Sequence, residues 1–562
     1  MRRIIIAIGF TIFTASSAFA QTPDKPVRLV LQITVDQLRA DLIERYAAGF
    51  GTNGFRQLLD KGAFFVNAHH RHANTETIVG HTTLATGADP AVHGMVANVW
   101  LNRASGELNY NVQDADYPLL GEGGGVDAKT EIDPTQLLAT TQGRSPRSIQ
   151  TTTIGDEIAL SLGPSARIFG VSVKDRSAIA MAGHTGKAYW FSKSEGRMIT
   201  SSYYMDAYPD WVDAWNKKGI PASYANTSWE LLAEPSAYLF GDADDMPWET
   251  SFPGFGRIFP HPFGPADGKY FTTLLTVAPA GDEIVLDFAR DLIAAEKIGA
   301  DEVTDYLSIS FSSTDYVGHI FGPSSLEAED NLHRLDRTLA KLFAYVDRNV
   351  GLEHTLVVLS ADHGASEAPG YLNSIGIGGS YFSFDDVDKS EAIAALKAEF
   401  GIAEELVDQF FQPYLYLNRE VIKSSGLDLA VVSRRVAEEL RKFPGISYAV
   451  SSQDLLAGAV ARTAVTDAVL ANFHEDRSGD IYVVFEPHWF VADFDGQSVT
   501  GSHGSPWIYD AHVPVIWMGP GISAGRIGQR IETVDVAPTI AAYLRVRYPS
   551  GSRGKVLGEI VD

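Results

Sequence analysis

Short apolar runs rich in β-branched residues recur along the chain, and segments with a helical period of apolar positions lie between several of them. The runs that predict strands are Arg28–Val35, Phe64–Val66, Arg167–Val173, Tyr306–Phe311, Thr355–Leu359 and Val513–Met518. The segments that predict helices are Ser148–Leu162, Asp282–Ile298 and Ser325–Val350. Continuous apolar strands alternating with helices indicate an α/β fold, with a mainly parallel sheet flanked by helices on both faces.

Two regions interrupt this alternation, and we predict that both are insertions in one catalytic domain spanning residues 21–562. Residues 189–275 are rich in Trp, Tyr, Pro and Gly and show little periodicity. We expect their aromatic side chains to pack within the insertion rather than to bind a ligand. Residues 366–495 predict a small α+β subdomain, with strands at Tyr414–Asn418, Ile446–Ser451 and Asp480–Phe485 and a helix at Leu429–Lys442.

The N-terminus has the pattern of an export signal. Two arginines precede the apolar run Ile4–Phe13, and Ala18-Phe19-Ala20 is a small-residue cleavage site. The run is too short to span a bilayer. We therefore predict a signal peptide over residues 1–20, cleavage near Ala20, and a periplasmic or secreted mature protein without a membrane anchor.

Composition narrows the chemistry. The 562 residues include 45 Lys and Arg against 70 Asp and Glu, which gives a formal net charge of −25. Such a surface repels a phosphate backbone and argues against a nucleic-acid-binding module. There are no cysteines, so disulfides, iron–sulfur clusters, thiolate zinc sites and a cysteine nucleophile are excluded together. Any metal must be held by His and carboxylate side chains.

Six potential metal ligands lie next to the predicted strands. They are three carboxylates and three imidazoles, namely Asp36, Asp315, His319, Asp362, His363 and His503. Asp315 and His319 are four residues apart, which places them on one face if that turn is helical. Because ligands of α/β sheets bind beyond the carboxyl ends of the strands, we expect the six to meet there. A set without thiols suits zinc or a related divalent pair.

Thr77 is the candidate nucleophile. It follows the apolar run Phe64–Val66 and precedes a helical pattern that reaches Thr86-Gly87. A hydroxyl at a helix N-terminus is stabilised as an alkoxide by the helix dipole, and a neighbouring metal would lower its pKa further. Spacing alone leaves Thr75, Thr82 and Thr83 as rival hydroxyls.

Several patterns were weighed and assigned no catalytic role. Gly521-Ile522-Ser523-Ala524-Gly525 matches a nucleophile elbow, but no histidine follows Ser523. A P-loop pattern and a sulfatase pattern are both missing from the sequence. His69, His70 and His72 alternate at a strand end, which predicts polar surface.

The chemistry-bearing residues also occur as a set of ordered motifs. These are Asp36, Thr77-x-x-Gly80-His81, His93-Gly94…Asn98, Lys174-Asp175-Arg176, Asp315-x-x-x-His319, Asp362-His363-Gly364, Gly501-Ser502-His503-Gly504 and Glu532–Thr539. Together they resemble the alkaline phosphatase superfamily, and most of all its phosphate-irrepressible bacterial phosphomonoesterases with a threonine nucleophile. The resemblance covers nearly the whole mature chain. Val79 departs from it, because relatives usually carry proline there.

The resemblance implies two zinc ions per chain. Asp315, His319 and His503 would hold the first; Asp36, Asp362 and His363 would hold the second, with the Thr77 oxygen as fourth ligand. Two zinc ions supply a charge of +4 against −4 from three carboxylates and one alkoxide, so a substrate dianion needs further cations. Other divalent metals fit the same ligands. A structural calcium site and the oligomeric state stay open.

The implied activity is that of an exported, metal-dependent alkaline phosphatase that hydrolyses phosphate monoesters through a phosphothreonine intermediate. Lys174, Arg176 and Asn98 would bind the non-bridging oxygens of a small phosphate ester. Two alternatives stay open: a phosphodiesterase or phosphonate hydrolase of the same superfamily, and a catalytically inactive binding protein. A diester carries one charge fewer, so Lys174 and Arg176 favour the monoester.

Overall fold

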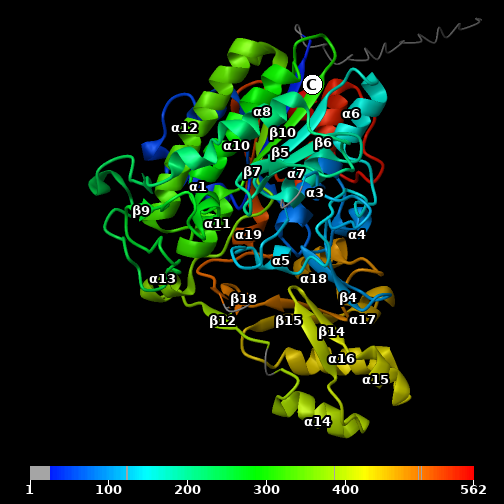
Figure 1. Ribbon diagram of the computed structural model, residues 1–562. Coiled ribbons are helices and arrows are strands. Elements are labelled where there is room, and N and C mark those ends of the chain that lie inside the picture. The colour runs from blue at the N-terminus through cyan, green and yellow to red at the C-terminus, as the bar shows by residue number, and fades with distance from the viewer. Residues whose placement is uncertain (1–25, 122–124, 385–386, 492, 495–496, 562) are drawn as a thin grey trace, which may run out of the picture.

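The computed structural model describes residues 26–121, 125–384, 387–491, 493–494 and 497–561. The signal peptide predicted for residues 1–20 lies outside the described residues. Within them, the chain forms a ten-stranded mixed sheet with helices on both faces and a four-stranded antiparallel sheet at one end (Figure 1). The predicted α/β class is confirmed. In this described part, no helix combines the length and the apolar character needed to cross a membrane.

The large sheet collects strands from most of the chain. Its members are β1 (Leu29–Val35), β2 (Ala63–His69), β5 (Ile168–Ser172), β6 (Lys187–Ser192), β7 (Arg197–Ile199), β10 (Asp305–Phe311), β11 (Thr355–Ser360), β20 (His512–Met518), β21 (Gly525–Ile527) and β22 (Ile531–Glu532). They lie in the order β21-β2-β20-β11-β1-β10-β5-β6-β7, with β22 paired to β2.

The strand directions decide where loops meet. β11, β1, β10, β5 and β6 run parallel. β20 runs antiparallel to both of its neighbours, β11 and β2. Residues that precede β20 therefore lie at the same edge as residues that follow the parallel strands, which brings the segment containing His503 to that edge.

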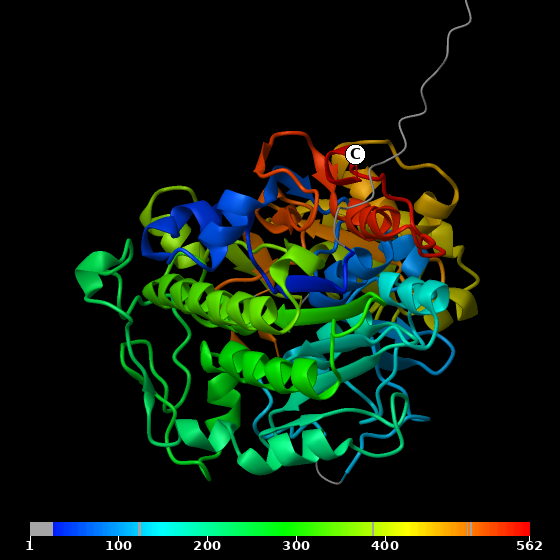
Figure 2. The same cartoon turned by 90° about the horizontal axis from the view of Figure 1, so that it is seen from above.

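Alternate residues of β1 face two helical layers. Leu29, Leu31 and Ile33 pack into a core with α10 (Ala280–Ala295) and α12 (Leu326–Asn349). Val30 points to the opposite face, which is covered by α3 (Thr77–Thr86), α6 (Ile154–Leu162) and α20 (Val536–Leu544). α7 (Asp175–Ala182) packs beside α3. Figure 2 shows α10 and α12, the two long green helices, side by side along one face.

The helix predicted for Ser148–Leu162 begins six residues later than expected. α6 starts at Ile154, because Thr153 and Asp156 form a reciprocal capping box that fixes its N-terminus. The prediction placed the boundary too early because the capping residues, not the apolar period, decide where a helix starts.

The Trp-rich region, residues 189–275, begins within β6 and continues through α8 (Asp210–Lys218), β8 (Ser228–Trp229) and β9 (His261–Pro262). Trp215 and Trp229 are buried in the main core. Their indole N–H groups donate to Asp287 on α10 and to Asp330 on α12, at 2.8 and 2.6 Å. The expectation that these aromatic side chains pack within the insertion was therefore too narrow for Trp215 and Trp229, which also pack against the helices of the main core.

The four-stranded sheet lies within residues 366–495 and has the order β13-β14-β16-β15. Its strands are β13 (Val407–Phe411), β14 (Tyr414–Leu417), β15 (Ile446–Ser451) and β16 (Ile481–Phe485), packed against α14 (Glu391–Phe400) and α16 (Leu429–Leu440). Tyr414, Tyr416 and Tyr482 face the other way, into a core shared with the main body. This region is drawn yellow to orange below the large sheet in Figure 1.

Short elements complete the described chain. They are α1 (Ala40–Arg45), α2 (Phe55–Lys61), α4 (Pro90–His93), α5 (Pro134–Leu137), α9 (Phe271–Thr276), α11 (Ser313–Phe321), α13 (Pro369–Ser374), α15 (Arg419–Ser424), α17 (Ser452–Leu456), α18 (Ala464–Asn472), α19 (Ile508–Ala511), α21 (Gly558–Val561), β3 (Val99–Asn102), β4 (Glu107–Tyr110), β12 (Ser380–Phe382), β17 (Trp489–Val491), β18 (Asp493–Phe494) and β19 (Gln497–Ser498).

Candidate active site

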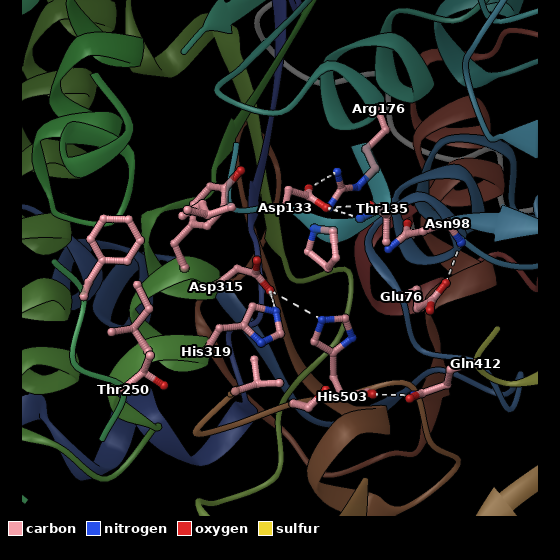
Figure 3. Close-up of a pocket in the computed structure, with 17 residues that line it drawn as sticks. Glu76, Asn98, Asp133, Thr135, Arg176, Thr250, Asp315, His319, Gln412 and His503 are labelled. Atoms are coloured by element: carbon pink, nitrogen blue, oxygen red, sulfur yellow. Dashed lines mark hydrogen bonds and ion pairs between the residues drawn. The ribbon is translucent and has the colours of Figure 1, made fainter. Parts of the chain in front are cut away.

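The six predicted ligands gather at one edge of the large sheet. Asp315 and His319 lie on α11, so the expected helical spacing is confirmed. His319 Nε2 lies 3.3 Å from Asp315 Oδ1, and His503 Nε2 lies 3.6 Å from the same oxygen (Figure 3). These three side chains form one candidate metal group.

A second candidate group contains Asp36, His363 and again Asp315. His363 Nε2 lies 3.6 Å from Asp36 Oδ1 and 3.4 Å from Asp362 Oδ2. The two groups therefore meet at Asp315. Asp362 turns its Oδ1 toward the backbone N–H groups of Gln37 and His363, at 3.1 and 3.0 Å, which leaves Oδ2 on the side of the imidazole.

The three imidazoles are oriented by backbone carbonyls. Their Nδ1 atoms lie 2.8 to 2.9 Å from carbonyl oxygens, His319 at Gly501, His363 at Gly364 and His503 at Thr75. This arrangement directs each Nε2 toward the carboxylates, as the outer hydrogen bonds of metal-ligating histidines do.

The donor set fits a small divalent ion. Ligand atoms about 2.0 Å from a tetrahedral zinc are roughly 3.3 Å apart, close to the 3.3–3.6 Å separations found here. Asp36 Oδ1 and His363 Nε2 are buried and have no hydrogen-bond partner among the described residues. Such atoms are costly to bury unless a ligand completes them.

Electrostatics at the site also favour a cation. Burial, followed by the charge of Asp362, raises the pKa of Asp36 well above its ordinary value. Burial also lowers the pKa of His503, and the neighbouring His363 and His319 lower it further. A neutral imidazole is the form that binds metal, and a bound divalent ion would restore the charge of the carboxylate.

Thr77 is the first residue of α3 and is almost fully buried. Its Oγ1 lies 3.4 Å from both Lys174 Nζ and Arg176 Nη2. Of the rival hydroxyls, Thr75 donates to Ser505 O and Thr83 to Val79 O. Thr82 Oγ1 is buried without a hydrogen-bond partner among the described residues, and neither cation is bonded to any of the three. Two cations beside one hydroxyl favour its ionised form.

A glycine allows this helix to approach the ligands. A Cβ atom at Gly80 would lie 1.9 Å from the backbone oxygen of Asp362. His81, in the next position, bonds Thr77 O through Nδ1 and Ser310 Oγ through Nε2, at 2.8 and 2.9 Å. Val79, the departure from the family pattern, is buried within the same helix. The Thr77-x-x-Gly80-His81 motif thus fixes the hydroxyl over the sheet edge.

Lys174 lies just past β5, as expected, but it also bonds the carboxylates of the predicted metal ligands, which the sequence did not predict. It is buried, its ammonium lies 2.8 Å from Asp36 Oδ2, and it also bonds Asp315 Oδ2. Burial alone would raise the pKa of Asp315, but Lys174, and next His319, hold it well below the ordinary value. Lys174 therefore links the carboxylates to the hydroxyl.

Arg176 is held by a residue that sequence reasoning missed. Its Nη1 lies 2.6 Å from Asp133 Oδ2. The other oxygen of Asp133 accepts the backbone N–H and hydroxyl of Thr135, at 3.0 and 2.6 Å. The second guanidinium nitrogen is thereby turned toward Thr77. Asp133 lies in a segment without a sequence motif, so no local signal marked it.

Two further residues position the site. Glu76 accepts the backbone N–H of Asn98, and Asn98 Oδ1 accepts Ile78 N at 3.3 Å. Gln37, which has a positive φ of 66°, donates from its backbone to Asp362 and from Nε2 to Asp315 at 2.9 Å. Both residues directly adjoin motif residues, Thr77 and Asp36, and that adjacency was the available signal.

The expectation for the histidines at 69, 70 and 72 was wrong. All three are buried. His69 stacks on His512, and His70 lies between Ala361 O and Thr533 Oγ1, at 3.1 and 2.9 Å. Strand β20 and the C-terminal segment cover this end of β2. Because both are distant in the chain, the alternation of histidines could not predict that these side chains are buried.

A cavity of about 110 Å³ opens beside the first ligand group. Asp315, His319 and His503 line it, whereas Asp36, Asp362 and His363 do not. Arg176 and Asn98 lie on one side, and the apolar side chains of Ile132, Phe252, Ile320 and Val499 contribute much of the rest (Figure 3).

The fold and this site define a class of hydrolases, the alkaline phosphatase superfamily. The model of the Type I phosphodiesterase / nucleotide pyrophosphatase family matches residues 30–506, and the chain belongs to this family.

Three curated relatives are similar over nearly their whole lengths. Alkaline phosphatase PafA of Elizabethkingia meningoseptica is 33% identical over 95% of this chain and 94% of its own. A protein of Myroides odoratus named calcium-transporting ATPase is 32% identical, covering 98% and 99%. Alkaline phosphatase PhoV of Synechococcus elongatus is 32% identical, covering 97% and 94%.

A solved structure supports the same placement. The crystal structure of PafA superposes with a TM-score of 0.86 at 32% identity, over 96% of this chain and 99% of that one. The predicted superfamily and fold are thus confirmed, and the chain is an enzyme of the hydrolase class.

Proposed function

We propose that the protein is an exported, metal-dependent alkaline phosphatase that hydrolyses phosphate monoesters through a phosphothreonine intermediate. The observation that carries the proposal is the convergence of Lys174 and Arg176 on the hydroxyl of Thr77, at 3.4 Å each. The names of PafA and PhoV support the monoesterase assignment, and the predicted signal peptide supports export.

Four side chains of the site have defined tasks in the proposed reaction. Thr77 Oγ attacks phosphorus, a P–O bond to threonine forms, and the bond to the leaving alcohol breaks. Water then cleaves the phosphothreonine and returns the proton to Thr77. Arg176 and Asn98 bind the non-bridging oxygens, where the negative charge of the transition state is spread. Lys174 keeps Asp315 ionised, lowers the pKa of Asp36 against the effect of burial, and favours the alkoxide of Thr77.

Two divalent ions, zinc by the chemistry of the donors, would occupy the site. Asp315, His319 and His503 would hold one, and Asp36, Asp362, His363 and the Thr77 oxygen would hold the other. Bound there, they supply Lewis-acid stabilisation of the attacking and leaving oxygens.

A second candidate function is phosphodiester hydrolysis, which the family description favours. The two activities share the nucleophile and the ligands but differ in substrate charge. A monoester dianion brings two negative charges to Lys174 and Arg176, which both lie beside Thr77, whereas a diester has one charge fewer and an additional substituent on phosphorus.

The test is the ratio of kcat/KM for phenyl phosphate to that for methyl phenyl phosphate, measured on the zinc-loaded mature protein at alkaline pH. We expect a ratio far above one. The double variant Lys174→Ala, Arg176→Ala should lower monoester hydrolysis far more than diester hydrolysis. A ratio below one would make the protein a phosphodiesterase, and equal losses on both substrates would contradict the role given to Lys174 and Arg176.

A further inference from the structure

The cavity of about 110 Å³ beside Asp315, His319 and His503 is called the metal-side cavity. Next to it lies a second cavity of about 330 Å³, which we call the apolar side cavity. Glu76, Asn98, Pro134, Thr135 and Gln412 line both cavities, so the two share one wall. The other residues around the apolar side cavity are Val99, Leu137, Leu138, Phe410, Phe411 and Val491.

The walls of the apolar side cavity come from two parts of the chain. Val99 and Leu138 belong to the main body, at β3 and at the C-terminal end of α5. Phe410 and Phe411 end β13 of the four-stranded sheet. Phe410 is held in place by stacking on Phe384, with the ring centroids 3.5 Å apart. Gln412, the next residue, is fixed by donating to His503 O at 2.8 Å.

The lining selects the chemistry of the occupant. Of the described residues around this cavity, Glu76 is the one with an ionisable side chain, and no lysine or arginine is among them. A second phosphate or another anionic group would find no counter-charge there, and the carboxyl of Glu76 would repel it. Six aliphatic and aromatic side chains instead suit an alkyl chain or an aromatic ring.

The geometry of the reaction points a leaving group in this direction. Attacking and leaving oxygens lie roughly in line across phosphorus. Thr77 does not line the metal-side cavity, whereas Asp315, His319 and His503 do. The alcohol therefore departs into that cavity. Its volume of about 110 Å³ is below the ~150 Å³ that accepts benzene, so a longer alcohol extends beyond it, and the apolar side cavity offers the adjoining apolar surface.

We propose that the apolar side cavity binds the distal part of long alkyl or aryl leaving groups, and so directs the enzyme toward phosphate monoesters of apolar alcohols. This inference rests on the proposed monoesterase function. It gives the four-stranded sheet a part in substrate binding, through Phe410, Phe411 and Gln412.

The experiment compares n-alkyl phosphates from ethyl to octyl as substrates, and the matching alkyl phosphonates as inert ligands in calorimetry, on the zinc-loaded mature protein. We expect kcat/KM to rise with chain length, by up to about fourfold for each methylene that enters the cavity. Phosphonate dissociation constants should fall in parallel, with an increasingly negative heat-capacity change. A flat dependence on chain length in both series would overturn the proposal.

A filling variant localises the effect. Leu138→Trp should lower the octyl-to-ethyl ratio of kcat/KM at least tenfold, whereas Leu160→Trp, at a position 62% exposed on α6, should leave that ratio unchanged. Equal losses on the short and long esters in Leu138→Trp would contradict the assignment.

Two further arms separate the explanations. A chain-length dependence confined to the second substituent of methyl alkyl phosphates would overturn the leaving-group assignment in favour of a diester subsite. Length-dependent binding of phosphonates without turnover of any alkyl phosphate would contradict the proposed function but support the cavity. Turnover without any length dependence would support the function and contradict the cavity.

Discussion

Two buried groups of carboxylates in this protein resolve the same physical problem differently. At the sheet edge, Asp36, Asp315 and Asp362 meet three imidazoles and the ammonium of Lys174. The second group consists of Glu249, within the Trp-rich region, and Glu327, on α12, which are 5% and 0% exposed. His261 Nε2 lies 3.2 Å from Glu327 Oε1, and no lysine or arginine bonds either glutamate among the described residues.

The carboxyl groups of the two sites consequently differ in pKa. Lys174 holds the pKa of Asp315 low despite its burial. Burial, followed by the charge of Glu327, raises the pKa of Glu249 to about 9. Glu249 Oε1 and Glu327 Oε2 are buried without hydrogen-bond partners among the described residues. Lys174 thus holds the charge of Asp315, whereas burial outweighs the same cation at Asp36 and meets no bonded cation at Glu249.

Removal of metal should have the largest effect and should affect only the first group. Dialysis against a chelator is expected to lower phenyl phosphate turnover on the order of 10³-fold or more, with recovery on adding zinc, because no other Lewis acid replaces the ions. The Tm should fall as well, because ligand binding to the folded state is lost. Calorimetry of the wild type and Glu249→Gln, with and without chelator, checks this. A smaller fall in Tm for Glu249→Gln would mean that the second group also holds metal.

Loss of the internal cation should have the next largest effect. In metal-free protein, Lys174→Met should reduce the free energy of unfolding by about 3–5 kcal/mol, because it leaves buried carboxylates without a partner. Zinc should restore much of that stability by supplying the missing positive charge. Denaturant unfolding at both metal states measures this, with Lys218→Met on the surface as the control. If zinc fails to compensate, Lys174 acts on packing rather than on charge.

The smallest effect concerns the second group and depends on pH. Above about pH 4.5 the unfolded chain releases the proton of Glu249, whereas the folded protein retains it up to about pH 9. The folded state thus binds more protons in this window, and stability falls as the pH rises. Glu249→Gln removes this loss, so its Tm relative to wild type should increase by a few degrees between pH 6 and pH 9.

The exposed Glu234→Gln supplies the control, and its Tm difference from wild type should be independent of pH. The same independence in Glu249→Gln would show that the buried pair is ionised throughout. In that case the contrast between the two groups would disappear.

Much of this architecture could be read from sequence, for identifiable reasons. The apolar runs at β1, β10 and β11 had to be buried on both faces, and a predicted metal ligand follows each of them within about one helical turn. The i,i+4 spacing of Asp315 and His319 requires only one helical turn. These features depend on residues near one another in the chain.

What sequence did not predict depends on distant contacts. Asp133 lies 43 residues from Arg176, and Lys174 lies 141 residues from Asp315. The apolar side cavity joins Leu138 to Phe410. Neither the spacing of apolar residues nor a short motif gives information about contacts between residues so far apart in the chain. The histidines near β2 were misjudged for the same reason, because the C-terminal segment buries them.

The reversed direction of β20 allows a long excursion of the chain. Because β11 and β20 are antiparallel neighbours, the chain leaves the sheet after Ser360 and returns before His512 at the same edge. Everything between them, including the four-stranded sheet, is inserted without a crossover. The part of this excursion between His363 and His503 can be lengthened, shortened or exchanged while the strands of the large sheet and all six predicted metal ligands remain. Exchange of this inserted segment can therefore change substrate preference while the residues that carry out the reaction stay the same.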